Sequence, residues 1–399
     1  MTRRWLPGTL MAVATALALI ASPAAAATTW TVMSTPNPGG QNVSDIYFTA
    51  VSGSSASDVW AAGIDQIGAT RSPLMAHWDG TRWRPVRVPM PANRQSWFNG
   101  IVAFSPTNAW AVGESSDPND QNQDQRTLIE HWDGTSWTIV PSPNPFTAGN
   151  SADVLMGIDG VGPNNIWAVG WAHDAPNNQI LMLLERFNGT AWSVAKSPSP
   201  LGSIHFGSAI TAIAANDAWA VGSDALAKTL AAHWDGQRWS IVPTPSPQDG
   251  SSPVNNLTGV TANGANDVWA SGYEGNVNNQ NFQEPYMLHW NGTSWTLVLT
   301  PNLGGEGSRL NATVALSPTD VWAVGQTQEL DGRIFTLTQQ FNGTTWTTVP
   351  SPSPGTSHPI DTLHGVASPG PGVVFTVGAR STAPGSCCLR TLALMTTTG

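Results

Sequence analysis

The chain has 399 residues, and only 11 % of them are Asp, Glu, Lys or Arg. There are 26 acidic and 16 basic residues, so the formal net charge is −10. An acidic surface repels polyanions, which argues against nucleic acid and anionic membranes as partners. Abundant Gly and Pro with few charged residues are typical of many short strands joined by turns.

Residues 1–27 have the features of a secretory signal peptide. Arg3 and Arg4 precede an apolar run at residues 10–20, and small residues follow at Ala24–Ala27. The arginine pair loosely resembles a twin-arginine signal, so both this export route and the general secretory route stay open. The apolar run is shorter than the ~20 residues that a membrane-spanning helix needs. We therefore expect a secreted, extracellular protein without membrane insertion.

A six-residue motif recurs along the rest of the chain. It reads Asp-Val-Trp-Ala-Val-Gly at Asp320–Gly325, and a degenerate copy surrounds Phe375. The other copies are Asp58–Gly63, Asn108–Gly113, Asn165–Gly170, Asp217–Gly222 and Asp267–Gly272. Their tryptophans are 50 to 57 residues apart. A period of this length indicates one supersecondary unit that is repeated.

Each repeat is predicted to contain four strands. An alternating segment leads through a short turn into the motif strand. A third strand ends in His-Trp-Asp-Gly, as at His131–Gly134, and Trp137 then begins a fourth strand that runs into Val-Pro-Ser-Pro. Asp-Gly between two strands favours a hairpin, because both turn residues need a positive φ. Four antiparallel strands per repeat, arranged radially, describe a β-propeller blade.

The two ends of the repeat array complement each other. Residues 28–38 match the fourth-strand segment 135–145 at six of eleven positions, including Trp30, and the last repeat lacks a fourth strand. We therefore expect an all-β fold, a seven-bladed β-propeller with four antiparallel strands per blade, in which strand 28–36 completes the C-terminal blade. Residues 28–399 then form one domain, with blades starting near residues 45, 98, 153, 208, 256, 309 and 361.

The combined pattern of Trp-Ala-Val-Gly, His-Trp-Asp-Gly-Thr-Ser-Trp and Val-Pro-Ser-Pro-Asn-Pro resembles tryptophan-rich propeller repeats in proteins secreted by actinobacteria and related soil bacteria. The resemblance covers residues 28–399 and implies the fold but no activity. The period also suits kelch repeats, and the hairpin is similar to a shortened sialidase Asp-box. The Gly-Gly doublet of the first and the Ser-x-Asp-x-Gly spacing of the second are missing, so no catalytic residue is carried over.

Residues that repeat in register are interpreted as scaffold. This applies to the tryptophans of the second and fourth strands and to the histidines before the third-strand Trp, namely His77, His131, His233 and His289. The turns between strands one and two and between strands three and four are short and uniform. They share one face, called the short-turn face. All other connections are long and individual and lie on the opposite, long-loop face. Binding residues favour such loops on a rigid frame.

Unrepeated side chains on the long-loop face are the candidates for ligand binding. Aromatic rings provide apolar contact area, while Arg, His and Asn side chains make directed hydrogen bonds. The candidates are Arg94, Trp97, Asn99, His173, His205, Tyr273 and His364.

Three carboxylates near the predicted channel mouth, Asp45, Asp153 and Asp361, are candidate Ca²⁺ ligands, because Ca²⁺ prefers oxygen ligands. A solvated polar channel is the alternative interpretation, and no other cofactor is expected. The only cysteines, Cys387 and Cys388, are adjacent. In an oxidising compartment they are predicted to form a disulfide that stiffens its loop but closes too little chain to contribute much stability.

These features favour a secreted, monomeric, non-catalytic binding protein that recognises an extracellular glycan or protein through its long-loop face. The alternative is an extracellular polysaccharide hydrolase or lyase that uses carboxylate or His groups at the channel mouth. The sequence contains no nucleophile elbow, zinc signature or phosphate-binding loop, which weighs against an enzyme. The fold alone does not decide, because propellers host both binding and catalysis.

Overall fold

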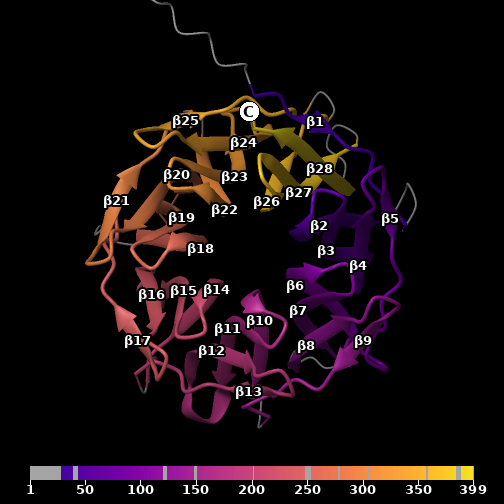
Figure 1. Ribbon diagram of the computed structural model, residues 1–399, viewed down its shortest axis with the longest axis vertical. Coiled ribbons are helices and arrows are strands. Elements are labelled where there is room, and N and C mark those ends of the chain that lie inside the picture. The colour runs from indigo at the N-terminus through magenta and orange to yellow at the C-terminus, as the bar shows by residue number, and fades with distance from the viewer. Residues whose placement is uncertain are drawn as a thin grey trace, which may run out of the picture.

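The computed structural model describes residues 28–38, 44–119, 124–147, 151–200, 202–247, 253–276, 279–303, 306–355, 358–382 and 388–398. The predicted signal peptide lies outside these ranges. Seven antiparallel sheets of four strands each form a ring around a central channel (Figure 1). The predicted seven-bladed β-propeller is therefore confirmed. In the described part of the chain the only helix is the short 3₁₀ turn η1 (Ala175–Asn177), and no helix there is long and apolar enough to cross a membrane.

Within each blade the strands follow one another from the channel to the rim. Blade one contains β2 (Ser44–Ser55), β3 (Asp58–Ile67), β4 (Thr70–Trp78) and β5 (Trp83–Pro85). Blade two contains β6 (Gln95–Ser105), β7 (Asn108–Ser116), β8 (Gln125–Trp132) and β9 (Trp137–Val140). Blade three contains β10 (Ala152–Gly162), β11 (Asn165–Asp174), β12 (Gln179–Phe187) and β13 (Trp192–Val194). Blade four contains β14 (His205–Ala214), β15 (Asp217–Asp224), β16 (Thr229–Trp234) and β17 (Trp239–Val242).

The remaining blades follow the same order. Blade five contains β18 (Pro253–Gly264), β19 (Asp267–Asn276), β20 (Asn279–Trp290) and β21 (Trp295–Leu299). Blade six contains β22 (Gly307–Ser317), β23 (Asp320–Gln328), β24 (Ile334–Phe341) and β25 (Trp346–Thr348). Blade seven contains β26 (Thr362–Gly370), β27 (Val373–Ser381), β28 (Leu389–Thr397) and, as its outer strand, β1 (Thr31–Val32).

The repeated tryptophans fill the junctions between blades. The ring of Trp60 in blade one lies 5.2 Å from that of Trp137 in blade two, and Trp60 is only 1 % exposed. The same second-strand to fourth-strand pairing recurs for Trp110 and Trp192, Trp167 and Trp239, Trp219 and Trp295, and Trp269 and Trp346. Large aromatic rings dominate the energetics of such cores. The interpretation of these tryptophans as core residues is therefore confirmed.

The N-terminal strand closes the ring. Thr31 of β1 pairs with Met395 of β28, and Figure 1 shows the N-terminal strand beside the C-terminal one. Trp30 packs edge-on against Trp322 of blade six, with ring centroids 5.5 Å apart, and is 8 % exposed. This is the junction that Trp137 and its equivalents make elsewhere, so β1 takes the place of a fourth strand.

A threonine on the third strand fastens the proline-rich connection that follows the fourth strand. Its hydroxyl donates a hydrogen bond of 3.1 Å to a proline carbonyl oxygen. The pairs are Thr127 and Pro143, Thr229 and Pro245, and Thr336 and Pro352. In blade seven Thr391 donates to Pro36 in the same way, at 3.0 Å. The N-terminal segment therefore also reproduces the hydrogen bonds of an internal repeat.

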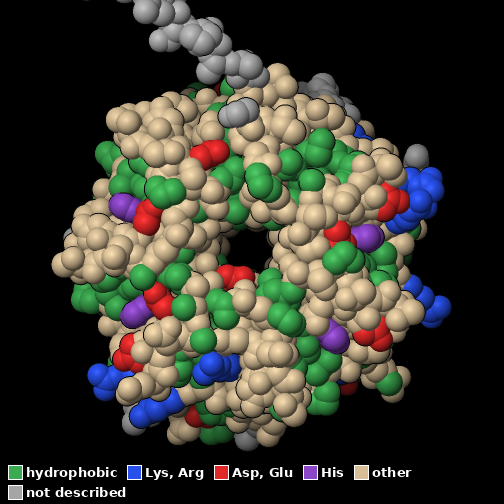
Figure 2. Space-filling view, in the orientation of Figure 1, with side chains coloured by type: hydrophobic (Ala, Val, Ile, Leu, Met, Phe, Trp, Pro, Cys, Tyr) green, Lys and Arg blue, Asp and Glu red, His purple; other side chains and the backbone are tan. Residues whose placement is uncertain are grey.

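Repeated polar contacts occupy the short-turn face. In blade one Nε2 of His77 lies 2.6 Å from Oδ1 of Asp58, and the imidazole packs on Trp60 with centroids 4.3 Å apart. Equivalent sets are Asp217, His233 and Trp219 in blade four and Asp267, His289 and Trp269 in blade five. Figure 2 shows this face, on which histidine side chains lie beside acidic ones around the ring. These contacts support the interpretation of the repeated histidines as scaffold.

Candidate functional site

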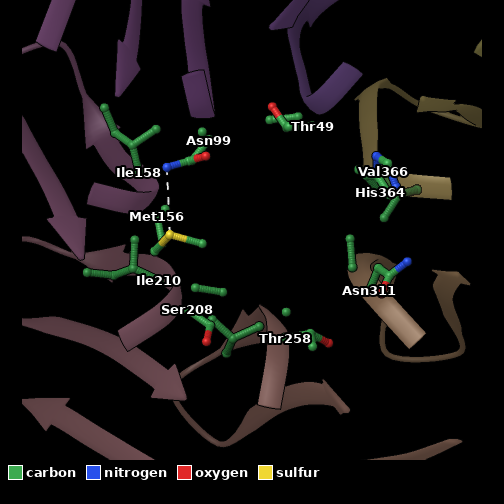
Figure 3. Close-up of a pocket in the computed structure, with 18 of the residues that line it drawn as sticks. Thr49, Asn99, Met156, Ile158, Ser208, Ile210, Thr258, Asn311, His364 and Val366 are labelled. Atoms are coloured by element: carbon green, nitrogen blue, oxygen red, sulfur yellow. Dashed lines mark hydrogen bonds between the residues drawn. The ribbon is translucent and has the colours of Figure 1, made fainter. Parts of the chain in front are cut away.

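The innermost strand of every blade carries one extra residue at the channel. The register of each first strand shifts at this point, which identifies a β-bulge that turns one side chain towards the channel. The bulged residues are Thr49, Asn99, Met156, Ser208, Thr258, Asn311 and His364 (Figure 3). They line a channel space of about 180 Å³.

The next residue is Gly or Ala in all seven blades, because the blades come closest here. A Cβ added to Gly365 would lie 3.0 Å from Cα of Ala50 in blade one. The backbones of neighbouring first strands therefore meet directly, and the size of the channel is set by this contact.

Most of the bulged side chains tie their blade to the next one. Each donates to the carbonyl that precedes the bulge of the following blade: Thr49 to Phe98 at 2.8 Å, Asn99 to Leu155 at 2.9 Å, Thr258 to Leu310 at 2.7 Å, Asn311 to Leu363 at 2.7 Å and His364 to Phe48 at 2.8 Å. Two candidate ligand-binding residues, Asn99 and His364, thus hold the ring together, a role that sequence reasoning did not assign to them.

The hydrogen bonds of His364 place a proton on Nδ1. Nδ1 donates to the carbonyl oxygen of Phe48, which can only accept, and Nε2 lies 2.8 Å from the hydroxyl of Thr362, which can donate to a neutral imidazole. The pKa of His364 is lowered to about 4, mainly because burial desolvates the imidazole; the bond to Phe48 opposes this shift, and the nearby positive charge of Arg309 adds to it.

We expect His364→Ala to cost about 1–3 kcal/mol of unfolding free energy, because the Phe48 carbonyl loses its donor. His364→Asn should cost less, since asparagine makes this tie in two other blades. The neutral imidazole is favoured in the folded protein, so stability should be lost as pH falls from about 6.5 to about 4. Urea unfolding at several pH values in this range measures the slope of the unfolding free energy against pH. In His364→Asn the part of this slope that comes from His364 should vanish. An unchanged slope would contradict the assigned state.

The three candidate calcium ligands accept backbone N–H groups. Leu389 N donates to Asp45 at 2.8 Å, Phe146 N to Asp153 at 3.4 Å, and Gly355 N to Asp361 at 2.7 Å. Burial raises the pKa of Asp153 to about 7 and raises that of Asp361. Within the described ranges, no group of three or more His, Cys, Asp or Glu residues could hold a metal ion. Calcium binding therefore stays a prediction.

The predicted disulfide involves Cys387, which lies outside the described residues. Cys388 is described and is buried immediately before the third strand of blade seven. Disulfide formation also stays a prediction.

The blades differ from one another directly beyond the repeated Gly of the second strand. A Cβ at Gly113 would clash with the carbonyl oxygen of Trp97, so the repeat needs glycine there. The following residue and its first-strand partner form a set that we call the variable layer: Ile64 and Tyr47, Glu114 and Trp97, Trp171 and Val154, Ser223 and Phe206, Tyr273 and Asn256, Gln326 and Arg309, and Ala379 and Thr362. The variable layer is where the long-loop face begins.

Arg94 braces the long-loop face of blade two. Its Nη2 donates to the carbonyl oxygens of Ser115 at 2.9 Å and Asp124 at 2.6 Å. Its Nη1 lies 3.1 Å from the Asp124 carboxylate, which also pairs with Arg126 at 2.5 Å. The guanidinium of this candidate is therefore engaged in contacts within the protein.

Three further candidates lie in three different blades. His173 is in β11 and is partly buried. His205 begins β14, where its Nδ1 lies 3.1 Å from the hydroxyl of Ser199 and burial lowers its pKa. The hydroxyl of Tyr273 accepts a bond from Nδ2 of Asn256 at 3.0 Å. The described contacts do not bring these three residues together into one site.

A pocket of about 410 Å³ opens between blades one and two on the long-loop face. Trp97 forms part of its wall and is only 6 % exposed. The guanidinium of Arg71 stacks on the Trp97 ring, with 4.6 Å between Cζ and the ring centroid. The other polar side chains of the lining include Gln66, Gln95, Gln125 and Asp117. The pocket therefore combines one cation, one carboxylate and three amides.

Glu114 lies behind this wall and is 6 % exposed. Burial raises its pKa to about 7, although hydrogen bonds from Asn99, Gln125 and Trp97 and the charge of Arg71 lower it. Nε2 of Gln125 donates to Glu114 at 2.5 Å. Glu114 therefore fixes the positions of Trp97 and Gln125 at the pocket.

Sequence reasoning identified Trp97 in this region but missed Arg71 and the three glutamines. In the strand register Arg71 lies opposite Gln66 in blade one, and Gln125 lies opposite Ser116 in blade two. Arg71 and Gln125 therefore occupy equivalent positions near the ends of their hairpins. A comparison of the starts of the third strands, repeat by repeat, would have found Arg71 and Gln125.

No protein-family model and no curated protein matches the chain. Among solved structures, a protein of unknown function from Dyadobacter fermentans DSM 18053 is similar with a TM-score of 0.57 and 10 % identity, over 94 % of this chain and 100 % of that one. YCF48 bound to D1 peptide has a TM-score of 0.54 and 14 % identity, over 94 % and 99 %. The polysaccharide lyase Uly1 has a TM-score of 0.53 and 10 % identity, over 93 % and 97 %. These similarities show the propeller fold and nothing finer.

Proposed function

We propose that the protein is an exported, non-catalytic binding protein that recognises an extracellular glycan or protein through its long-loop face. The observation that carries this proposal is the variable layer. On the short-turn face the contact between a second-strand Asp and a third-strand His recurs in three blades. Beyond the repeated Gly, by contrast, each blade carries a different pair. These side chains are buried or half-buried at the base of the long loops, and loops that differ on a rigid frame are typical of binding surfaces. The export part of the proposal rests on residues 1–27.

The pocket between blades one and two supports the same proposal. Its volume of about 410 Å³ is within the ~300–1,000 Å³ that is usual for ligand sites. Its guanidinium, carboxylate and amides make directed hydrogen bonds, which provide specificity. The similar solved propellers include one bound to a peptide and one polysaccharide lyase, so frames of this kind accommodate both proposed classes of ligand.

Glycan and peptide arrays, followed by alanine substitutions on both faces, test the proposal. On the long-loop face the variants are Gln125→Ala, Leu226→Ala and Leu330→Ala, of which the two leucines are 70 % and 78 % exposed. On the short-turn face the matched variants are the exposed Thr135→Ala, Gln237→Ala and Thr344→Ala. We expect at least one long-loop variant to weaken binding about tenfold or more, because a few residues usually provide most of the binding energy.

Two results would contradict the proposal. The first is that the short-turn variants lose binding while the long-loop variants bind with unchanged affinity. The second is release of reducing ends or unsaturated products from a bound polysaccharide, which would replace binding by the hydrolase or lyase alternative.

A further inference from the structure

Arg71 is held in place by its neighbours but has no ionic partner among the described residues. Its Cζ lies 4.6 Å from the Trp97 ring centroid, its Nε donates to Oε1 of Gln66 at 3.3 Å, and its backbone N–H donates to Oε1 of Gln95 at 3.2 Å. Within the described ranges, no carboxylate lies within ion-pair distance of Arg71, and neither terminal nitrogen has a hydrogen-bond partner. The outer edge of its guanidinium is therefore open to the pocket.

Three other arginines of the long-loop face are paired with carboxylates. Arg94 and Arg126 both pair with Asp124, at 3.1 and 2.5 Å, and Arg333 lies 2.6 Å from Asp331. In a chain of net charge −10, carboxylates are plentiful, and yet none in the described ranges forms an ion pair with Arg71, although its charge acts on Glu114 behind the pocket wall. An arginine that is oriented but unpaired is suited to bind the carboxylate of a ligand through two parallel hydrogen bonds.

The exposure of Trp97 decides which kind of sugar the pocket suits. A neutral sugar is usually bound by stacking on an open aromatic face, but Arg71 covers the Trp97 ring and only 6 % of the residue is exposed. Recognition at this pocket must instead use charge and hydrogen bonds. Three glutamine side chains in the lining offer both donors and acceptors to hydroxyl groups.

We propose that this pocket binds a uronic acid residue of an acidic oligosaccharide, with Arg71 on its carboxylate and the glutamine amides on its hydroxyls. The proposal rests on the proposed function and names its ligand class. Asp117 lines the same pocket and repels the ligand carboxylate, so it limits the affinity. Arg71 is the specificity-determining residue, because it distinguishes the acid from the otherwise identical neutral sugar.

Calorimetric titration with cellobiouronic acid and with cellobiose tests the proposal, because the two disaccharides differ only in the carboxylate. We expect the acid to bind about tenfold or more tightly, as a charged hydrogen-bonded pair usually contributes. Arg71→Gln should remove this preference. Arg71→Lys should retain part of this preference, because lysine keeps the positive charge but cannot make two parallel hydrogen bonds to a carboxylate. Arg333→Gln is the matched control and should leave both affinities unchanged.

Asp117→Asn gives a second test, in which the expected result is tighter binding, a result that an unfolded variant cannot give. Removal of the like charge should tighten the binding of cellobiouronic acid about threefold and leave cellobiose unaffected. Equal affinity for the two disaccharides, binding of neither, or an acid preference that survives Arg71→Gln would overturn the proposal. If the array ligands bind the long-loop face independently of Arg71, only this inference fails. If they bind the short-turn face, the proposed function fails with it.

Discussion

Deletion of residues 28–36 is expected to destroy the stable propeller. The deletion removes β1, exposes the edge of β28 and uncovers Trp322, which packs against Trp30. It also removes the hydrogen-bond partners of Thr391 in the proline-rich segment. A bare hydrophobic sheet edge pairs with other molecules. Calorimetry and size-exclusion chromatography should therefore show aggregation or a large fall in melting temperature.

Trp30→Ala removes the packing of the Trp30 ring at the closure of the propeller but leaves strand β1 in place. Loss of a buried tryptophan should cost about 3–5 kcal/mol of unfolding free energy, measured by urea titration. Thr31→Ala is the matched control, because Thr31 is exposed on the same strand and should change stability by about 0.5 kcal/mol or less. A deletion variant that melts like the full chain, or a Trp30→Ala variant of normal stability, would contradict closure by this strand.

The closure could be predicted from the sequence because it depends on residues that repeat. Trp30 stands in the same context as Trp137, and the missing fourth strand of the last repeat left one place for it. The indole pairs and the threonine ties then follow from strand order. Where one residue type recurs at the same position of each repeat, its structural environment also recurs. The sequence pattern is then sufficient to predict that environment.

The channel lining could not be predicted in this way. Strand residues alternate between the two faces of a sheet, and a bulge breaks this alternation by one residue. Nothing in the sequence marks Asn99 or His364 as the extra residue, because the bulge becomes visible only in the pairing with the second strand. Both were expected to bind ligand, and in the structure they bond the next blade.

The seam between blades six and seven shows a second limit. Thr396 of blade seven pairs with Val374 as Trp234 of blade four pairs with Ala218, so a threonine stands where other blades have an aromatic ring. A pocket of about 550 Å³ lies nearby on the short-turn face, lined by residues of blades six and seven. Its presence depends on side-chain volumes across two blades, which a pattern within one repeat does not contain.

Glu130 is a carboxyl group at a core position that varies between blades. It is 0 % exposed, and neither carboxylate oxygen has a hydrogen-bond partner. Register places it opposite Ala111, a position that the other blades fill with Ala76, Glu185, Ala232, Leu288, Gln339 and Leu394. A buried, unpaired carboxyl group is costly, and the cost is greatest when the group is charged.

This burial makes stability depend on pH. It raises the pKa of Glu130 from an ordinary value of 4.5 to about 8. As pH rises through this interval, the unfolded chain releases the proton first, so unfolding becomes more favourable. The contribution to stability is full below about pH 4.5 and is lost by about pH 8. Burial also raises the pKa values of Asp153 and Glu185, so the same trend should persist in part without Glu130.

We therefore expect Glu130→Gln and Glu130→Leu to stabilise the protein, and the gain should grow by on the order of 3 kcal/mol between pH 5 and pH 8. Leucine is the residue that blade five carries at this position. Urea unfolding at several pH values measures the difference from the unaltered protein. Gln339→Leu is the matched control: it loses a bond to Pro301 at the equivalent position, and its effect should not change with pH. A gain from Glu130→Gln that stays constant over this range would show that the Glu130 carboxyl is not protonated in the folded protein.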